Sequence, residues 1–116
     1  MRIGRIKTKY IDIQDAIIKQ TGIYGDGSPC LRLVDEADTT APYAATITVR
    51  IEGNDLPENH VWIKGWSENV GLPDQLELSG CFIPTDVLMM VGGHNATTRL
   101  YQMSHELVES IHRGEH

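Results

Sequence analysis

Residues 43–52, YAATITVRIE, constrain the fold more than any other segment, because apolar and polar side chains alternate along them. One face carries the aliphatic residues Ala45, Ile47, Val49 and Ile51. A period of two built mostly from β-branched residues is typical of a strand with one buried face. Residues 30–36 alternate in the same way around Leu31 and Leu33. The two segments together predict an antiparallel hairpin, with the acidic run at 34–38 as its solvated tip.

Other segments also have the composition of strands. Residues 60–66, HVWIKGW, predict the third strand of a meander. Further extended segments are predicted at residues 2–13, 82–91 and 96–103, and turns at 25–29, 53–59 and 92–95, where Gly, Asn, Asp and Pro gather. In residues 2–13 the alternation is partial, because Ile3 is out of phase with Ile6.

Residues 12–22, DIQDAIIKQTG, predict a short helix. Asp12 has the chemistry of an N-cap and Gly22 that of a helix stop. Ile13 and Ile17 would share one face of the helix. The high isoleucine content leaves a strand as the alternative.

Two more helices are predicted nearer the C-terminus. In residues 67–80, Ser67 or Asn69 is the expected N-cap and Gly80 the expected stop, with Leu72 and Leu76 on one side. Ser104 is then expected to cap a terminal helix whose apolar stripe is Leu107, Val108 and Ile111.

The chain of 116 residues is 41 % hydrophobic, which is enough for one core. We therefore predict a single α+β domain over residues 1–116. It consists of a mainly antiparallel sheet, arranged as a meander, with two or three short helices on it.

Charge limits the kinds of partner. Ten Lys and Arg against 16 Asp and Glu give a net charge of −6. This balance argues against direct binding to nucleic acid, which requires a basic face. It favours another protein with a basic surface as partner, although solubility alone also accounts for a modest negative charge.

The N-terminal residues lack the apolar core of a signal peptide, and the sequence has no apolar run of about 18 residues. We expect a cytoplasmic protein that does not enter a membrane. Cys30 and Cys81 form no CxxC pair, so both are expected to be unpaired thiols.

Both tryptophans lie in the segment HVWIKGWSENVG, residues 60–71. A strand that leaves a sheet and enters a helix needs a break and a cap, which Gly65 and the Ser-Glu-Asn run supply. We expect Trp62 and Trp66 to cover this junction. The alternative is that Trp66 and the acidic turn form an exposed contact for a partner.

His105, Glu109 and His112 would lie on one side of the terminal helix, at spacings i, i+4 and i+7. Two imidazoles and a carboxylate can bind zinc. Glu109, however, occupies the second histidine position of the HExxH pattern, and the triplet lies away from the apolar stripe. We therefore favour a solvated helix face, and we expect no metal or other cofactor.

The motifs between residues 30 and 85 resemble the family catalogued as domain of unknown function 4313. Its pattern is matched by Leu31, Leu33 and Asp35, by residues 42–45 with Thr46, Thr48 and Val49, and by Ile63, Lys64, Trp66, Ser67, Glu68, Asn69 and Gly71. PYAATITV departs from the pattern by an extra alanine where threonine is usual. The resemblance implies an accessory protein of a phage, plasmid or integrated element, and it brings no catalytic residue.

The leading hypothesis is a non-enzymatic protein-binding module, directed against a host or defence complex, whose contact residues are Trp66, Ser67, Glu68 and Asn69. The first alternative is a small enzyme, with a metal on the terminal helix or with Cys30 or Cys81 as nucleophile. The second alternative is a structural module that associates with itself.

Overall fold

The structure is a computed structural model that describes residues 1–38, 40, 43–51, 56–91 and 96–113. Their first four strands form one antiparallel sheet in the order β1-β2-β3-β4. The bounds are β1 (Arg2–Lys7), β2 (Asp12–Ile23), β3 (Pro29–Val34) and β4 (Tyr43–Thr46). The predicted hairpin is confirmed, since Leu33 pairs with Ala45 and Arg32 with Thr46. The predicted solvated tip is wrong at Val34, which is the buried last residue of β3, whereas residues 35–38 follow the strand.

The helix predicted at residues 12–22 is wrong, and the alternative strand is correct. Ile17 and Ile18 are both buried. Consecutive residues of a strand face opposite ways, so both faces of β2 are covered at this point. β2 pairs with β1 on one side and β3 on the other. A central strand rich in β-branched residues gains more from this pairing than from a short isolated helix.

The partial alternation of the first strand has a local cause. The β1–β2 register shifts on both sides of Gly4, whose φ of 82° lies in the left-handed region. In a regular strand Ile3 and Ile6, three residues apart, would face opposite ways. The irregularity between them lets Ile3 pack against the core that buries Ile6. β1 ends at Lys7, and the turn that follows is closed by a hydrogen bond from Thr8 N to Ile11 O of 2.7 Å.

The strand predicted at 43–52 is divided between two sheets at Ile47. Ile47 N donates to Leu31 O of the first sheet, and Ile47 O accepts from Lys64 N, which follows β6 (His60–Ile63), each at 2.8 Å. The next strand, β5 (Thr48–Val49), pairs with β6. The predicted alternation fails at this point, because Thr48 is buried while Val49 is only half-buried.

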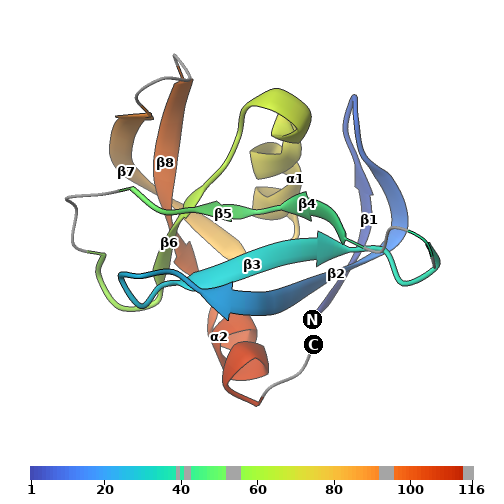
Figure 1. Cartoon of the computed structure of the whole chain (residues 1–116), viewed down its shortest axis with the longest axis horizontal. Coiled ribbons are helices and arrows are strands. Elements are labelled where there is room, and N and C mark those ends of the chain that lie inside the picture. The colour runs from blue at the N-terminus through green and yellow to red at the C-terminus, as the bar shows by residue number, and fades with distance from the viewer. Residues whose placement is uncertain (39, 41–42, 52–55, 92–95, 114–116) are drawn as a thin grey trace.

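The second sheet has the order β5-β6-β8-β7, with β7 (Phe82–Val91) and β8 (Ala96–Met103) forming antiparallel neighbours. The extended segments predicted at 82–91 and 96–103 are therefore strands. The turn predicted at 92–95 lies outside the described residues. The chain passes through Ile47 from one sheet to the other (Figure 1). Buried side chains of both sheets, such as Leu33 and Phe82, belong to one common core.

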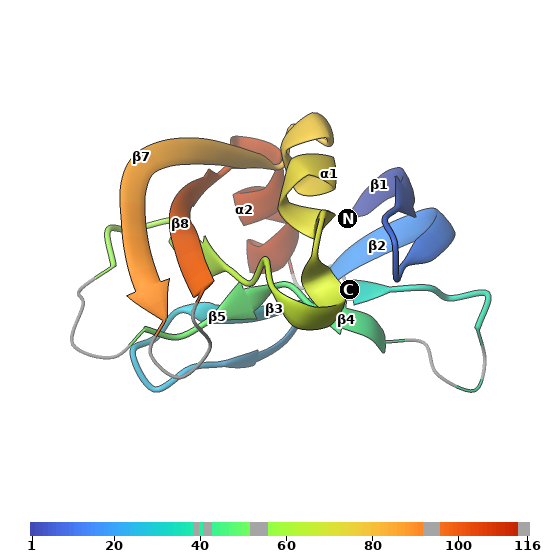
Figure 2. The same ribbon diagram turned by 90° about the horizontal axis from the view of Figure 1, so that it is seen from above.

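The helix α1 (Leu72–Leu78) packs against both β1 and β7. Figure 2 shows it between β7 and β8 on one side and β1 on the other. Leu72 and Leu76 point into the core, as predicted, and Gly80 follows the helix at a φ of 79°. The predicted cap is wrong, because the N-cap is Gly71 and a short 3-10 helix, η1 (Ser67–Asn69), comes before it.

The terminal helix α2 (His105–His112) begins as predicted, with Ser104 Oγ accepting a hydrogen bond from Leu107 N at 3.2 Å. Leu107 is buried, and Val108 and Ile111 pack against the core. The α+β class, with mainly antiparallel sheet and short helices, is confirmed. No helix in the described ranges is long and apolar enough to cross a membrane.

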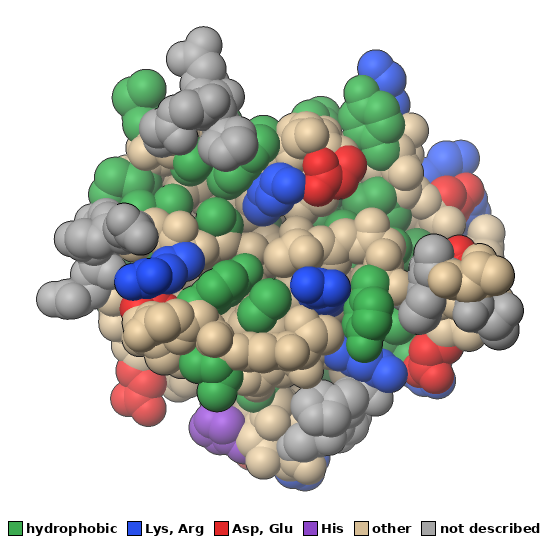
Figure 3. Space-filling model, in the orientation of Figure 1, with side chains coloured by type: hydrophobic (Ala, Val, Ile, Leu, Met, Phe, Trp, Pro, Cys, Tyr) green, Lys and Arg blue, Asp and Glu red, His purple; other side chains and the backbone are tan. Residues whose placement is uncertain are grey.

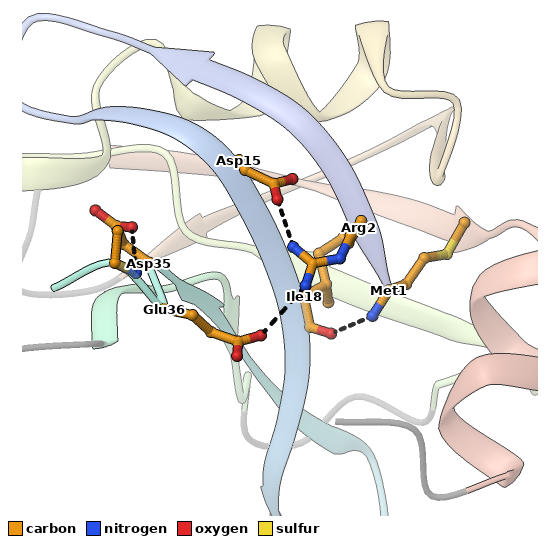
Figure 4. A network of polar contacts seen from close by, with 7 residues as sticks. Met1, Arg2, Asp15, Ile18, Asp35 and Glu36 are labelled. Atoms are coloured by element: carbon orange, nitrogen blue, oxygen red, sulfur yellow. Dashed lines mark hydrogen bonds and ion pairs between the residues drawn. The ribbon is translucent and has the colours of Figure 1, made fainter. Parts of the chain in front are cut away.

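The exposed edge of β1 carries charge. Arg2 forms ion pairs with Asp15 of β2 and with Glu36 at the hairpin tip (Figure 4), and Arg5 pairs with Asp12 at 3.4 Å. In the same view the Met1 amine donates to Ile18 O at 2.9 Å. Charged side chains and the irregularity at Gly4 disfavour pairing of this edge with another strand.

Candidate functional site

Asn69 is the structural anchor of the Ser-Glu-Asn turn. Its side chain is fully buried, at 0 % exposure. Its Nδ2 donates to Thr46 O at 2.7 Å and to Lys64 O at 3.1 Å. These bonds tie η1 to the end of β4 and to the residue after β6. Burial removes Asn69 from the predicted contact surface.

The other three predicted contact residues surround this anchor. Ser67 and Glu68 are exposed, Trp66 is half-buried, and Trp62 is buried within β6. Lys64 Nζ donates to Glu68 Oε1 at 2.7 Å, and this bond is the main reason why the pKa of Glu68 falls to about 2. Glu68 is therefore charged, but its charge is partly neutralised by a neighbour on the same chain.

A larger apolar surface lies on β7. Figure 3 shows apolar side chains gathered over the region of β7 and β8, in the upper left of the view. Ile83, Val87, Leu88 and Met90 are all exposed, with Leu88 at 53 % and Met90 at 73 %. Val87, Leu88 and Met90 follow one another along one end of β7, whereas Ile83 lies at the other end, opposite Gln102. Exposed large apolar side chains that gather in this way are typical of an interaction site. The sequence analysis missed it, although the unbroken apolar run VLMMV at 87–91 was a usable signal.

The β7 edge is regular over only part of its length. Pro84 lacks a backbone donor, and the register with β8 shifts between Pro84 and Leu88. This irregular part is held in place by Arg99 Nη1, which donates to Thr85 O at 2.6 Å. From Leu88 to Val91 the pairing with β8 is regular again. Residues 88–91 are thus the segment of this edge that can pair with another strand.

A hollow of about 370 Å³ adjoins this segment. It is lined by Ile63, Pro73, Leu88, Thr97, Arg99 and Tyr101. Leu88 faces Arg99 across the β7–β8 pair, so the hollow continues the surface of the edge onto the sheet face. Its lining combines apolar side chains such as Leu88 with the guanidinium of Arg99.

The three residues considered as zinc candidates, and set aside in favour of a solvated helix face, are only partly brought together. His105 Nε2 lies 2.8 Å from Glu109 Oε1, and Glu109 Oε2 lies 3.5 Å from Arg113 Nη1. His112 instead lines a separate cavity with residues 56–60. Among the described residues no group of three His, Cys, Asp or Glu is placed to hold a metal ion.

Both cysteines are unpaired, as predicted, but their surroundings differ. Partial burial of Cys30 opposes its ionisation, yet hydrogen bonds with Tyr24, Thr21 and Arg32 outweigh that effect and lower its pKa. Burial raises the pKa of Cys81. The groups that contact Cys30 are hydroxyls and a guanidinium, which stabilise a thiolate but are not general bases of the imidazole type.

This difference predicts the order of thiol modification. In the native protein we expect a disulfide reagent to modify Cys30 at least about tenfold faster than Cys81, because the thiolate at an accessible position is the reacting form. Unfolded protein should show two reactive groups per chain. Cys30→Ser should leave only the slow group, and equal rates for the two thiols in native protein would contradict this assignment.

Comparison with known proteins gives no relative: no family model, curated protein or solved structure matches the chain.

Proposed function

We propose that this chain is a non-enzymatic protein-binding module that docks an extended segment of a partner protein along β7. The observation that carries the proposal is the exposed apolar edge at residues 88–91, where Met90 and Leu88 stand out most. An outer strand presents unpaired backbone N–H and C=O groups, and an added strand satisfies them while its side chains fill neighbouring hollows.

The contrast between β1 and β7, which are outer strands of different sheets, supports this choice. The β1 edge bears Arg2, Arg5 and Lys7 and is interrupted at Gly4. The β7 edge bears aliphatic side chains and methionines in its regular part. Proteins usually guard exposed edges with charge or irregularity. Since the β1 edge of the same molecule is guarded, the apolar β7 edge is better explained by a partner than by chance.

The nature of the partner is also a proposal. The resemblance to the domain of unknown function 4313 family suggests an accessory protein of a mobile genetic element, and hence a host or defence protein as partner. The net charge of −6 suits a partner with a basic surface. Trp66, Ser67 and Glu68 are retained as a second proposed contact. A thiol enzyme at Cys30 is disfavoured because the side chains that act on its thiol within the described ranges, Tyr24, Thr21 and Arg32, are not general bases.

Capture of proteins from a bacterial lysate tests the β7 edge with a matched pair of variants. Met90→Lys places a charge on the edge, whereas Leu78→Lys changes an apolar residue of α1 that is 82 % exposed. We expect Met90→Lys to weaken rebinding of the purified captured protein by about tenfold or more, because buried charge at an interface core is costly. Leu78→Lys should bind like the wild type.

Equal capture by Met90→Lys and the wild type would contradict the proposal. Light scattering on the same proteins separates a second occupant. If the wild type dimerises and Met90→Lys does not, the edge pairs with another copy of the chain, and the alternative of a self-associating module replaces the present proposal.

A further inference from the structure

A cavity of about 380 Å³ lies between the turn joining β2 to β3, residues 56–60 and the helix α2. This volume falls within the range of known ligand pockets. Its apolar lining comes mainly from Pro29, Leu56, Met103, Val108 and Ile111. In Figure 1, α2 lies below β2 and β3 while β7 lies above β5, so the cavity is separate from the β7 edge.

The polar part of the lining has a definite charge. It holds the carboxylates of Asp26 and Glu58 and the imidazoles of His60 and His112, while Lys and Arg are absent from the lining that the structure describes. Asp26 accepts hydrogen bonds from the hydroxyl and from the backbone N–H of Ser28, and these bonds, chiefly the one from the hydroxyl, lower the pKa of Asp26 and keep it ionised. The charge of Arg50 also lowers the pKa of Asp26. Anionic ligands are disfavoured, and an apolar ligand with a neighbouring cation is favoured.

The walls of the cavity are fixed by backbone hydrogen bonds. Asn59 O accepts from Met103 N at 2.8 Å, which attaches residues 56–60 to β8. Tyr24 N donates to Ser28 O at 2.8 Å across the β2–β3 turn. His60 Nδ1 lies 2.8 Å from Glu58 O, so in the neutral ring Nδ1 donates and Nε2 is left as an acceptor. A site that is held in place before binding avoids the cost of ordering its walls.

We propose that this cavity binds an aliphatic side chain of a partner peptide, with Lys or Arg residues beside it in that peptide lying against Glu58 and Asp26. The apolar lining accommodates the aliphatic side chain. The exposed acidic rim gives charge complementarity to a basic peptide, in keeping with the net charge of −6. The proposal adds a second docking site and does not depend on strand pairing at β7.

Fluorescence polarisation with a defined peptide tests the site. The probe is fluorescein-labelled Lys-Arg-Leu-Arg-Lys amide, with a second probe in which serine replaces leucine. We expect saturable binding of the first probe. The second probe should bind at least about tenfold more weakly, as for loss of an aliphatic group from a pocket. Glu58→Lys should lower the affinity for the first probe about fivefold or more. Glu106→Lys alters an exposed carboxylate outside the lining and should leave this affinity within about twofold of the wild-type value.

Several results would overturn the proposal. Equal binding of the leucine and serine probes would mean general charge attraction without an anchored side chain. Equal effects of Glu58→Lys and Glu106→Lys would also mean that the peptide is held by general charge attraction and not by this cavity. Binding of isopentylamine as tight as that of the peptide would identify a free amine as the ligand. In the ¹⁵N-labelled protein, binding of the peptide is expected to shift the amide signals of Gly27, Ser28 and Ile111. Shifts at residues 88–91 instead would assign the peptide to β7. No binding up to about 1 mM peptide would overturn the proposal.

Discussion

Replacing Asn69 with alanine is expected to destabilise the protein by about 2–3 kcal/mol, because two partly buried carbonyl groups lose the donor that a fully buried side chain supplies. Those carbonyls, of Thr46 and Lys64, lie at the point where the chain passes between the sheets. The loss is partly offset, since Asn69 Oδ1 is buried and has no hydrogen-bond partner among the described residues. For a domain of this size the melting temperature should fall by about 10 °C.

Thermal unfolding followed by circular dichroism measures this effect. Asn69→Asp keeps the shape of the side chain and removes its donor, so it should be at least as destabilising as the alanine variant. Gln14→Ala removes an amide side chain from an exposed position of β2 and serves as the control, with an expected change of about 0.5 kcal/mol or less. A melting temperature for Asn69→Ala equal to that of Gln14→Ala would refute the anchoring role.

Replacing Leu76 with alanine is expected to cost about 3 kcal/mol and to lower the melting temperature by about 12 °C. Leu76 is at 0 % exposure in the core, on the side of α1 that fills the space between β1 and β7. Truncation would leave a cavity where the two outer strands approach the same helix. The energetic cost combines lost burial with lost contacts around that cavity.

The same helix supplies a matched control. Leu78 is the same residue type two positions later and is exposed, so Leu78→Ala should change stability by about 0.5 kcal/mol or less. Comparing the two melting curves removes the effect of helix propensity, which is common to both changes. Equal shifts for the two variants would show that α1 does not pack between the outer strands as described.

Local chemistry was enough to predict several elements. The hairpin followed from the alternation in residues 30–36 and 43–46, the start of α2 from Ser104, and the end of α1 from Gly80. Each of these signals depends on residues close together in sequence. Where tertiary pairing decides the outcome, local chemistry failed. β2 carries cap and stop residues suited to a helix, but its neighbours on both sides make it a strand.

The passage of the chain between sheets at Ile47 has no local signal, because the alternating pattern simply continues into β5. It depends on hydrogen bonds to Leu31 and Lys64, which are distant in sequence. Asn69 was likewise misjudged from local sequence, which indicated Ser67 or Asn69 as a helix cap. Its true partners, the carbonyls of Thr46 and Lys64, are brought to it only by the fold.

The candidate sites were predicted less well than the fold. The run VLMMV was visible in the sequence, but its exposure depends on β7 being an outer strand, which pairing order alone decides. The cavity beside α2 combines residues from the β2–β3 turn, residues 56–60 and the helix α2 with the end of β8. A site formed by three distant segments leaves no pattern of spacing in any one of them.

Amide hydrogen exchange is the most direct test of docking at β7. The ¹⁵N-labelled protein is measured alone and bound to the purified captured partner, at the same pH and temperature. If a partner strand pairs with this edge, the backbone amides within residues 88–91 that point away from β8 should exchange at least about tenfold more slowly in the complex, because they gain hydrogen bonds. Unchanged exchange at residues 88–91, with slowing confined to residues 66–68, would contradict docking at β7 and assign the partner to the acidic turn.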